Sequence, residues 1–350
     1  MSSIRLASAQ DEKKWDSYVS QHPDATPYHR FAWLTSAQNA YGHKAIAWLA
    51  EDEQGNIIGV LPSVLIKPPM KSGKLSALPF CDVGGVLANS AEVNQQLLNT
   101  ANRYCTDHRI NTFEHRQSIE LSENSPEAIA SASKVRMLLN LPESAETLFT
   151  GFKSKLRSQI RKAEKNGLTS STGRDQKHLD GFYHVFARNM RDLGSPVHSK
   201  KWFEQILANY QDNIIIANVY KDDIVVGAGI VLINGKNCSI PWASTNADYN
   251  RLAPNMLLYW SLLSYVADNG FSSFDFGRST PGEGTYKFKQ QWGAEPVALD
   301  WQTFQQGQCL PEEAVGSKGK LREIVETCWK KLPVNTSVMI GPAIRKYISL

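Results

Sequence analysis

The stretch from Asp275 to Gly293 constrains the fold more than any other part of the sequence. Its start, Ser272-Ser-Phe-Asp-Phe276, alternates small or polar residues with aromatic ones and therefore predicts a strand. The residues that then interrupt it permit backbone angles closed to other residues, so a ligand can come close to the chain. They are Gly277, Pro281, Gly282 and Gly284.

A short helix is expected directly after this turn, with Thr285 as its N-cap and with Tyr286, Lys287 and Lys289 in its first turns. A strand that leads through a glycine loop into a lysine-bearing helix start suits an anionic acyl donor or acceptor. The alternative is a surface turn whose lysines are solvated.

The bulk composition is that of a soluble globular protein long enough for two domains, with 350 residues, 42% hydrophobic and 21% charged. No apolar run approaches the roughly 20 residues that span a bilayer. The first ten residues lack a sustained apolar core, so no secretory signal is expected. Five cysteines form no C-x-x-C pair and the eight histidines no H-x-x-x-H pair, which predicts a cytoplasmic, reduced protein without a metal site.

The order of predicted elements occurs twice along the chain. In each half, two helices precede a strand hairpin, a further helix and a final strand. Ile57-Ile-Gly-Val60 also aligns with Val225-Val-Gly-Ala228, and Asn111–Ser118 aligns with Ser272–Ser279 after one gap. The sequence therefore predicts two copies of one mixed α/β domain, over residues 1–145 and 146–305, followed by a helical tail over 306–350.

A basic helix is predicted to open the second copy. Residues 150–167 hold six Lys or Arg against one Glu, although the whole chain carries only +4. Arg157 and Arg161 lie one turn apart beside an apolar stripe, and Lys162 follows them. Arginine suits bidentate phosphate binding, so a diphosphate clamp is the functional interpretation and a solvated face the alternative.

Two carboxylates are candidates for the site. Asp82 precedes a Gly-Gly pair, and its carboxylate could orient an acceptor amine or only cap a turn. Asp275 and Arg278 flank the end of the predicted strand, where an internal ion pair is the alternative to catalysis.

Three segments in order resemble the FemAB-like acyltransferases. They are Leu78-Pro-Phe-Cys-Asp-Val-Gly-Gly85, the helix Lys155–Leu168 with its R-x-x-I-R-x-A spacing, and FDFGRS followed by Y-x-F-K-x-x-W-G in residues 274–293. The pattern is most similar to FemAB-related proteins of exopolysaccharide and exosortase systems. The resemblance covers roughly residues 25–305.

This resemblance implies an α/β fold of two tandem GNAT-like acyltransferase domains and an acyl or aminoacyl transferase acting on an amine. The acceptor would be an anionic cell-envelope or exopolysaccharide glycan precursor, with Arg157, Arg161 and Lys162 on its phosphates. The resemblance also places a functional lysine at Lys289. Tyr286 and Asp275 would assist catalysis, and Lys287 would support substrate binding with Asp82 and Arg278.

The donor is expected to be either aminoacyl-tRNA or acyl-coenzyme A, with no permanently bound cofactor. GNAT enzymes hold coenzyme A on an (R/Q)-x-x-G-x-(G/A) turn, and the corresponding Asn250–Met256 contains Arg251, a candidate for substrate binding, but no glycine. Pro254 there removes one amide donor, which weakens the coenzyme A alternative. A third hypothesis is a non-catalytic module that binds a glycan precursor.

The tail carries a local charge of +3 and invites two interpretations. Its basic residues, with Trp329 and Val338–Ile340, could touch an anionic membrane surface, which would make the protein membrane-peripheral. The alternative is a helix packed across the two domains. The basic residues of the membrane interpretation are Lys318, Lys320, Arg322, Lys330 and Lys331.

Overall fold

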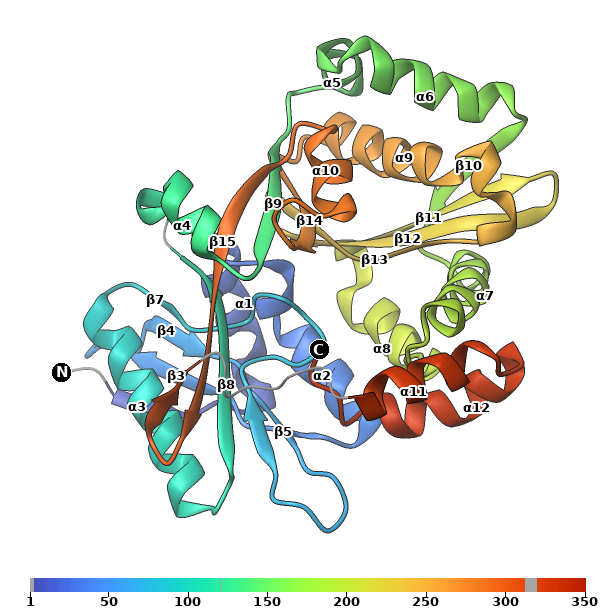
Figure 1. Cartoon of the computed structure of the whole chain (residues 1–350). Coiled ribbons are helices and arrows are strands. Elements are labelled where there is room, and N and C mark those ends of the chain that lie inside the picture. The colour runs from blue at the N-terminus through green and yellow to red at the C-terminus, as the bar shows by residue number, and fades with distance from the viewer. Residues whose placement is uncertain (1–2, 120, 312–319) are drawn as a thin grey trace.

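The computed structural model describes residues 3–119, 121–311 and 320–350, and only the backbone of residues 121 and 320–322. Lys318 lies outside the described residues, as do the side chains of Lys320 and Arg322. The chain forms two α/β halves joined by a shared sheet, with the C-terminal helices against one side (Figure 1). The predicted mixed α/β class, the tandem arrangement and the C-terminal helices are confirmed.

Helices and strands are interspersed along both halves. The helices are α1 (Glu12–Gln21), α2 (Phe31–Tyr41), α3 (Ala91–Asp107), α4 (Pro126–Ser131), α5 (Ala145–Gly151), α6 (Ser154–Lys165), α7 (Gln176–Leu193), α8 (Lys200–Tyr210), α9 (Pro254–Asp268), α10 (Gly284–Gln290), α11 (Lys320–Lys330) and α12 (Val334–Arg345). The strands are β1 (Ser3–Leu6), β2 (Lys44–Ala45), β3 (Trp48–Glu51), β4 (Ile57–Leu61), β5 (Val64–Ile66), β6 (Lys74–Ser76), β7 (Leu87–Ala88), β8 (Thr112–Ser118), β9 (Val135–Asn140), β10 (Leu168–Gly173), β11 (Ile214–Lys221), β12 (Ile224–Asn234), β13 (Asn237–Thr245), β14 (Ser273–Ser279), β15 (Glu295–Gln305) and β16 (Gln308–Leu310).

Two local predictions differ from the structure. The basic helix is not continuous, because Phe152 is extended (ψ 147°) and separates α5 from α6. This break turns the Phe152 ring toward Trp292, at 5.5 Å between ring centroids, so burial of an aromatic side chain outweighs helix continuity. Thr285 is not an N-cap either, because α10 begins at Gly284 and its N-cap is Glu283.

A sheet of twelve strands runs through both halves in the order β10-β11-β12-β13-β14-β9-β15-β8-β6-β5-β2, with β16 paired to β15. β15 is the strand that joins the halves, since Glu295–Ala298 pair with β9 and Leu299–Phe304 pair with β8. β9 precedes residue 145, yet it lies between β14 and β15. Strand pairing therefore crosses the predicted borders at 145 and 305.

The two halves also share a hydrophobic core. One buried cluster combines α1 and α2 with α7, α8 and β12. At its centre, the ring of Trp33 lies 5.1 Å from that of Trp202 and is stacked at 5.8 Å on that of Trp242. Because residues from both halves fill one close-packed cluster, their relative position is fixed by packing as well as by the sheet.

The tail packs on both halves, as the second interpretation predicted. α11 and α12 lie against α7, and Trp329 is buried. Beyond α12, the carbonyl of Ser349 accepts hydrogen bonds from the Phe80 amide (2.6 Å) and from Arg116 (3.2 Å). The end of the tail is thus held against the first half.

β13 and β14 separate in the middle of the sheet. They pair in parallel only from Asn237–Ser273 to Ser239–Asp275, and beyond these residues the described parts of the two strands do not pair with each other. Both strands bulge at this point: Ile240 and Pro241 oppose Val231, and Phe276 and Gly277 oppose Met137. Bulges bend the strands that carry them, which explains the opening between β13 and β14.

Candidate functional site

A cavity of about 380 Å³ lies at the opening between β13 and β14. β13 contributes Ile240–Ala243 to its wall, and β14 contributes Phe276–Arg278. The loop Phe80–Asp82 of the first half, Lys289 of α10 and Arg345 of α12 complete the part that matters for chemistry. Segments far apart in the sequence, from both halves and the tail, therefore meet in one cavity.

Asp82 is held by contacts with the second half. Its Oδ2 accepts a hydrogen bond from the Arg278 amide at 3.1 Å, and its Oδ1 lies 3.6 Å from Nε of Arg278. The Arg278 guanidinium covers the ring of Trp301 at 5.1 Å, and the Trp301 indole donates to the Asp82 carbonyl at 3.0 Å. These contacts fix a carboxylate in the wall of the cavity, where it can accept a hydrogen bond from an amine.

Lys289 is buried, with 8% of its surface exposed. Its Nζ donates to the carbonyls of Gly277 (3.0 Å) and Arg278 (2.7 Å). An ammonium has three hydrogens, so one remains for the cavity when the described residues take two. Burial lowers the pKa of Lys289 to about 8, although Asp275 and Asp82 act in the opposite direction.

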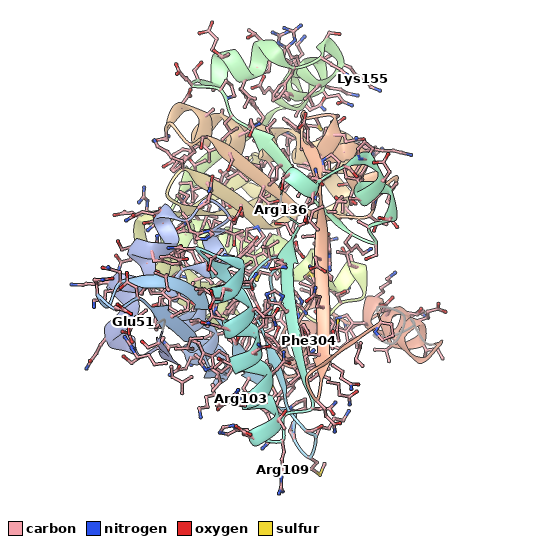
Figure 2. The ribbon with its side chains drawn as sticks, turned by 90° about the vertical axis from the view of Figure 1, so that its left-hand side faces the viewer. Glu51, Arg103, Arg109, Arg136, Lys155 and Phe304 are labelled. Carbon is pink, nitrogen blue, oxygen red and sulfur yellow. The ribbon has the colours of Figure 1, made fainter. Side chains whose placement is uncertain are left out.

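Asp275 does not line the cavity. It is 4% exposed, forms an ion pair with Arg136 (2.9 Å) and accepts a hydrogen bond from the Gly277 amide (2.8 Å). Arg136 lies near the middle of the molecule in Figure 2, beside the strands that join the halves. The carboxylate thus forms an internal ion pair, but with Arg136 of β9 and not with Arg278, and these contacts hold the bulge of β14 in place.

Tyr286 and Lys287 also lie away from the cavity. The Tyr286 hydroxyl accepts a hydrogen bond from the side-chain Nε2 of Gln290 at 3.2 Å, and its ring packs on the core beneath α9 and α10. Lys287 is exposed. Of the three neighbouring polar residues predicted on α10, the structure brings Lys289 alone to Asp82 and Arg278.

The predicted phosphate-binding cations gather elsewhere, in two shallow hollows. Arg157, Arg161 and Lys162 line one of about 440 Å³ on α6, where the Arg161 guanidinium covers the Phe149 ring at 5.2 Å. Lys162 and Arg251 line another of about 360 Å³ at the start of α9. Figure 2 shows Lys155 of the same helix at one end of the molecule. The α6 residues therefore form a surface separate from the cavity.

Sequence reasoning missed several residues of the cavity, among them Tyr28, Trp242 and Arg345. Trp242 had a usable signal, because Pro241 within an otherwise regular strand pattern indicates a bulge. Arg345 had none, since its place depends on the path of the tail.

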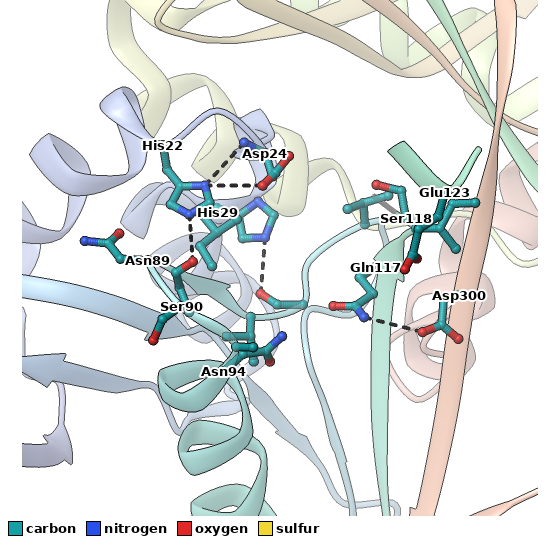
Figure 3. Close-up of a pocket in the computed structure, with 17 residues that line it drawn as sticks. His22, Asp24, His29, Asn89, Ser90, Asn94, Gln117, Ser118, Glu123 and Asp300 are labelled. Carbon is teal, nitrogen blue, oxygen red and sulfur yellow. Dashed lines mark hydrogen bonds and ion pairs between the residues drawn. The ribbon is translucent and has the colours of Figure 1, made fainter. Parts of the chain in front are cut away.

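A larger cavity, of about 480 Å³, is lined by Val83 and Gly85, which follow the loop Phe80–Asp82 in the chain (Figure 3). Carboxylates, amides and imidazoles surround it, and none of the described lining residues is Lys or Arg. Burial lowers the pKa of His29 to about 3, so this imidazole is neutral at physiological pH. Within the described residues, no group of His, Cys, Asp and Glu could hold a metal ion.

Comparison with known families identifies residues 150–290 as an acetyltransferase (GNAT) domain. This match confirms the prediction that the chain carries an acyltransferase domain. Among curated proteins, none matches the chain significantly.

Solved structures that are similar in fold include the following three. FemX is 13% identical, with a TM-score of 0.64, and the match covers 93% of this chain and 100% of FemX. A tandem GNAT protein from the clavulanic acid biosynthesis pathway is 12% identical (TM-score 0.54, covering 88% of this chain and 99% of that one). L-PGS from Bacillus licheniformis is 10% identical (0.53, covering 92% and 98%). The tandem GNAT fold and the likeness to FemAB-like proteins are thereby confirmed at the level of fold.

Proposed function

We propose that the chain transfers an acyl or aminoacyl group to an amine of a cell-envelope or exopolysaccharide precursor, in the cavity between β13 and β14. The observation that carries this proposal is the meeting of Asp82, from the first half, with Lys289, from the acetyltransferase domain, in one cavity. A carboxylate from one half could contact the acceptor amine while an ammonium from the other half contacts the donor carbonyl.

In the proposed reaction, the nitrogen of the acceptor amine attacks the carbonyl carbon of the donor. A C–N bond forms, and the oxygen or sulfur of the carrier leaves with its electron pair. Asp82 orients the amine and takes its proton directly or through water, and this proton finally neutralises the leaving group. The Lys289 ammonium donates its third hydrogen to the oxyanion that forms on the carbonyl. Tyr286, Lys287 and Asp275 have no direct part in this scheme.

Two classes of donor are compatible with this proposal. GNAT acetyltransferases use acyl-coenzyme A as a diffusible donor, and the hollow with Lys162 and Arg251 at the start of α9 suits its phosphates. Pro254 lacks an amide hydrogen, however, and the Met256 amide already donates to Ala253, so few donors remain in this turn. Aminoacyl-tRNA, the donor implied by the FemAB-like resemblance, requires no such turn.

A thermal-shift screen of the full chain tests these alternatives. Acetyl-coenzyme A, UDP-N-acetylglucosamine and a non-hydrolysable aminoacyl-tRNA analogue are added singly and in pairs, and transfer is followed by mass spectrometry. Transfer from one donor to an amine acceptor supports the proposal and selects the donor. Binding of the sugar nucleotide without transfer from any donor would favour the glycan-binding module instead.

The hollow on α6 is proposed as a separate phosphate site for the acceptor or the tRNA. Replacing both Arg157 and Arg161 by alanine is expected to weaken binding about tenfold or more, because two charge-assisted contacts are lost. The melting temperature should stay unchanged, since both side chains lie off the buried face of α6. Calorimetric titration against the cognate precursor and against tRNA measures the effect, and Lys155→Ala is the matched control on the same helix. Unchanged affinity for both would reduce this surface to a solvated face.

Contact with an anionic membrane is proposed for α11 and α12. Ile324 and Val325 on α11 and Met339 on α12 are more than half exposed, and Lys330 and Lys331 lie near them in the chain. Each basic residue near an anionic surface contributes about 1 kcal/mol. We expect co-sedimentation with phosphatidylglycerol vesicles, weakened by Lys330→Gln with Lys331→Gln. Equal recovery with neutral vesicles would contradict this contact.

Among the described residues, no helix has the length and apolar content that a membrane span requires.

A further inference from the structure

Arg345 brings a partly buried positive charge from the tail into the cavity. It is the last residue of α12, its guanidinium covers the Phe80 ring at 5.2 Å, and one of its nitrogens donates to the Ile348 carbonyl at 2.5 Å. No described carboxylate forms an ion pair with it, in contrast to Arg136, Arg116 and Arg278. A partly desolvated cation without an ion-pair partner would gain from an anionic ligand.

The other charged side chains of the cavity add to its excess of positive charge. Arg278 and Lys289 add two positive charges and Asp82 one negative charge. His198, which also lines the cavity, is neutral because burial lowers its pKa well below the usual value. Burial lowers the pKa of Arg345 to about 10, and the positive fields of Arg116 and Arg278 act in the same direction. The lining side chains therefore carry a net charge of about +2 at neutral pH, and about +1 when the α-carboxylate of Leu350, which also lines the cavity, is counted. This positive charge, with two guanidinium groups, suits a phosphate group.

Arg345 is also held in place before any ligand binds. The segment after it is fixed by the contacts of Ser349 with Phe80 and Arg116, and by a hydrogen bond of 2.8 Å between a His43 ring nitrogen and the Lys346 carbonyl. A cation that is already positioned loses little conformational entropy when it binds.

We propose that Arg345, together with Arg278, binds a phosphate group of one substrate, so that the tail completes the transferase site and selects for a phosphorylated substrate. This inference rests on the proposed function, since it concerns the same cavity. It places recognition of phosphate beside Asp82 and Lys289, in addition to the separate surface on α6.

Calorimetric titration of the full chain with inorganic pyrophosphate tests the inference without any need for turnover. Arg345→Gln is expected to weaken binding about tenfold or more, and Arg345→Lys, which keeps the charge but not the two-pronged geometry, should weaken it less. Lys346→Gln is the matched control, because the Lys346 ammonium lies over the Tyr347 ring at 4.9 Å and is not among the groups lining the cavity. Melting temperatures identify variants that have lost the fold. If Arg345→Gln is one of them, the pyrophosphate affinity of Arg278→Gln is compared with that of the wild type instead.

The same titrations with UDP-N-acetylglucosamine and with coenzyme A separate the sources of the phosphate. Loss of affinity for the sugar nucleotide in Arg345→Gln assigns the phosphate to the acceptor, and loss for coenzyme A assigns it to the donor. Equal affinities of the wild type and all folded variants for the three probes would overturn the inference, as would the absence of any binding to the wild type. If pyrophosphate binding depends on Arg345 but no acyl transfer is found, the inference stands and the proposed function fails.

Discussion

Replacing Lys289 by methionine is expected to lower the turnover number about 100- to 1000-fold while changing the affinity for substrates much less. The reason is that the oxyanion exists only in the transition state, so the third ammonium hydrogen contributes little to ground-state binding. The loss corresponds to about 2.7–4 kcal/mol of transition-state stabilisation. Steady-state kinetics with the donor and acceptor found in the screen measure it.

Lys287→Met is the matched control for this variant, because it changes the same residue type on the same short helix but at an exposed position. It should keep near-normal turnover. If Lys287→Met loses activity and Lys289→Met retains it, the sequence resemblance has been transferred to the wrong lysine. If both retain it, α10 has no part in the chemical step. Circular dichroism of Lys289→Met is needed beside the kinetics, since the lysine also holds the carbonyls of Gly277 and Arg278.

Arg136→Met is expected to destabilise the protein by about 3–5 kcal/mol, because it leaves the Asp275 carboxylate buried and unpaired between β9 and β14. The matched control is Arg174→Met, which breaks the ion pair of Arg174 with Asp212. That pair is exposed, so its loss should cost about 1 kcal/mol or less. The denaturation midpoints in urea compare the two variants with the wild type.

Asp275→Asn distinguishes a structural from a catalytic role of this carboxylate. A structural role predicts that turnover falls only as far as the folded fraction falls. Normal stability with abolished turnover would instead return Asp275 to the catalytic residues, among which the sequence placed it as a candidate.

The sequence was most informative where function is carried by a short continuous segment. The strand before Gly277, the helix with Lys289 and the Asp82 loop were each predicted from local patterns, and the structure brings Asp82 and Lys289 into one cavity. Local patterns also predicted the helices that became α1–α3 and α7–α9.

Features that depend on long-range contacts were not predictable. β9 and β15 owe their places to each other and to strands from both halves, and no local pattern shows which edge a strand will join. The break between α5 and α6 depends on an aromatic contact with Trp292, more than a hundred residues away in the sequence. Arg345 reaches the cavity only because the tail folds back against Phe80 and Arg116.

The way β9 and β15 cross between the halves makes the tandem protein indivisible, although it has the form of a duplication. A fragment of residues 146–305 would lack β9. The backbone groups of β14 and of the first part of β15 that pair with β9 would then have no partner strand. The first half alone would lose the strand that covers β8. Neither half is therefore expected to fold as a free-standing module, and the distance between Asp82 and Lys289 is set when the chain folds.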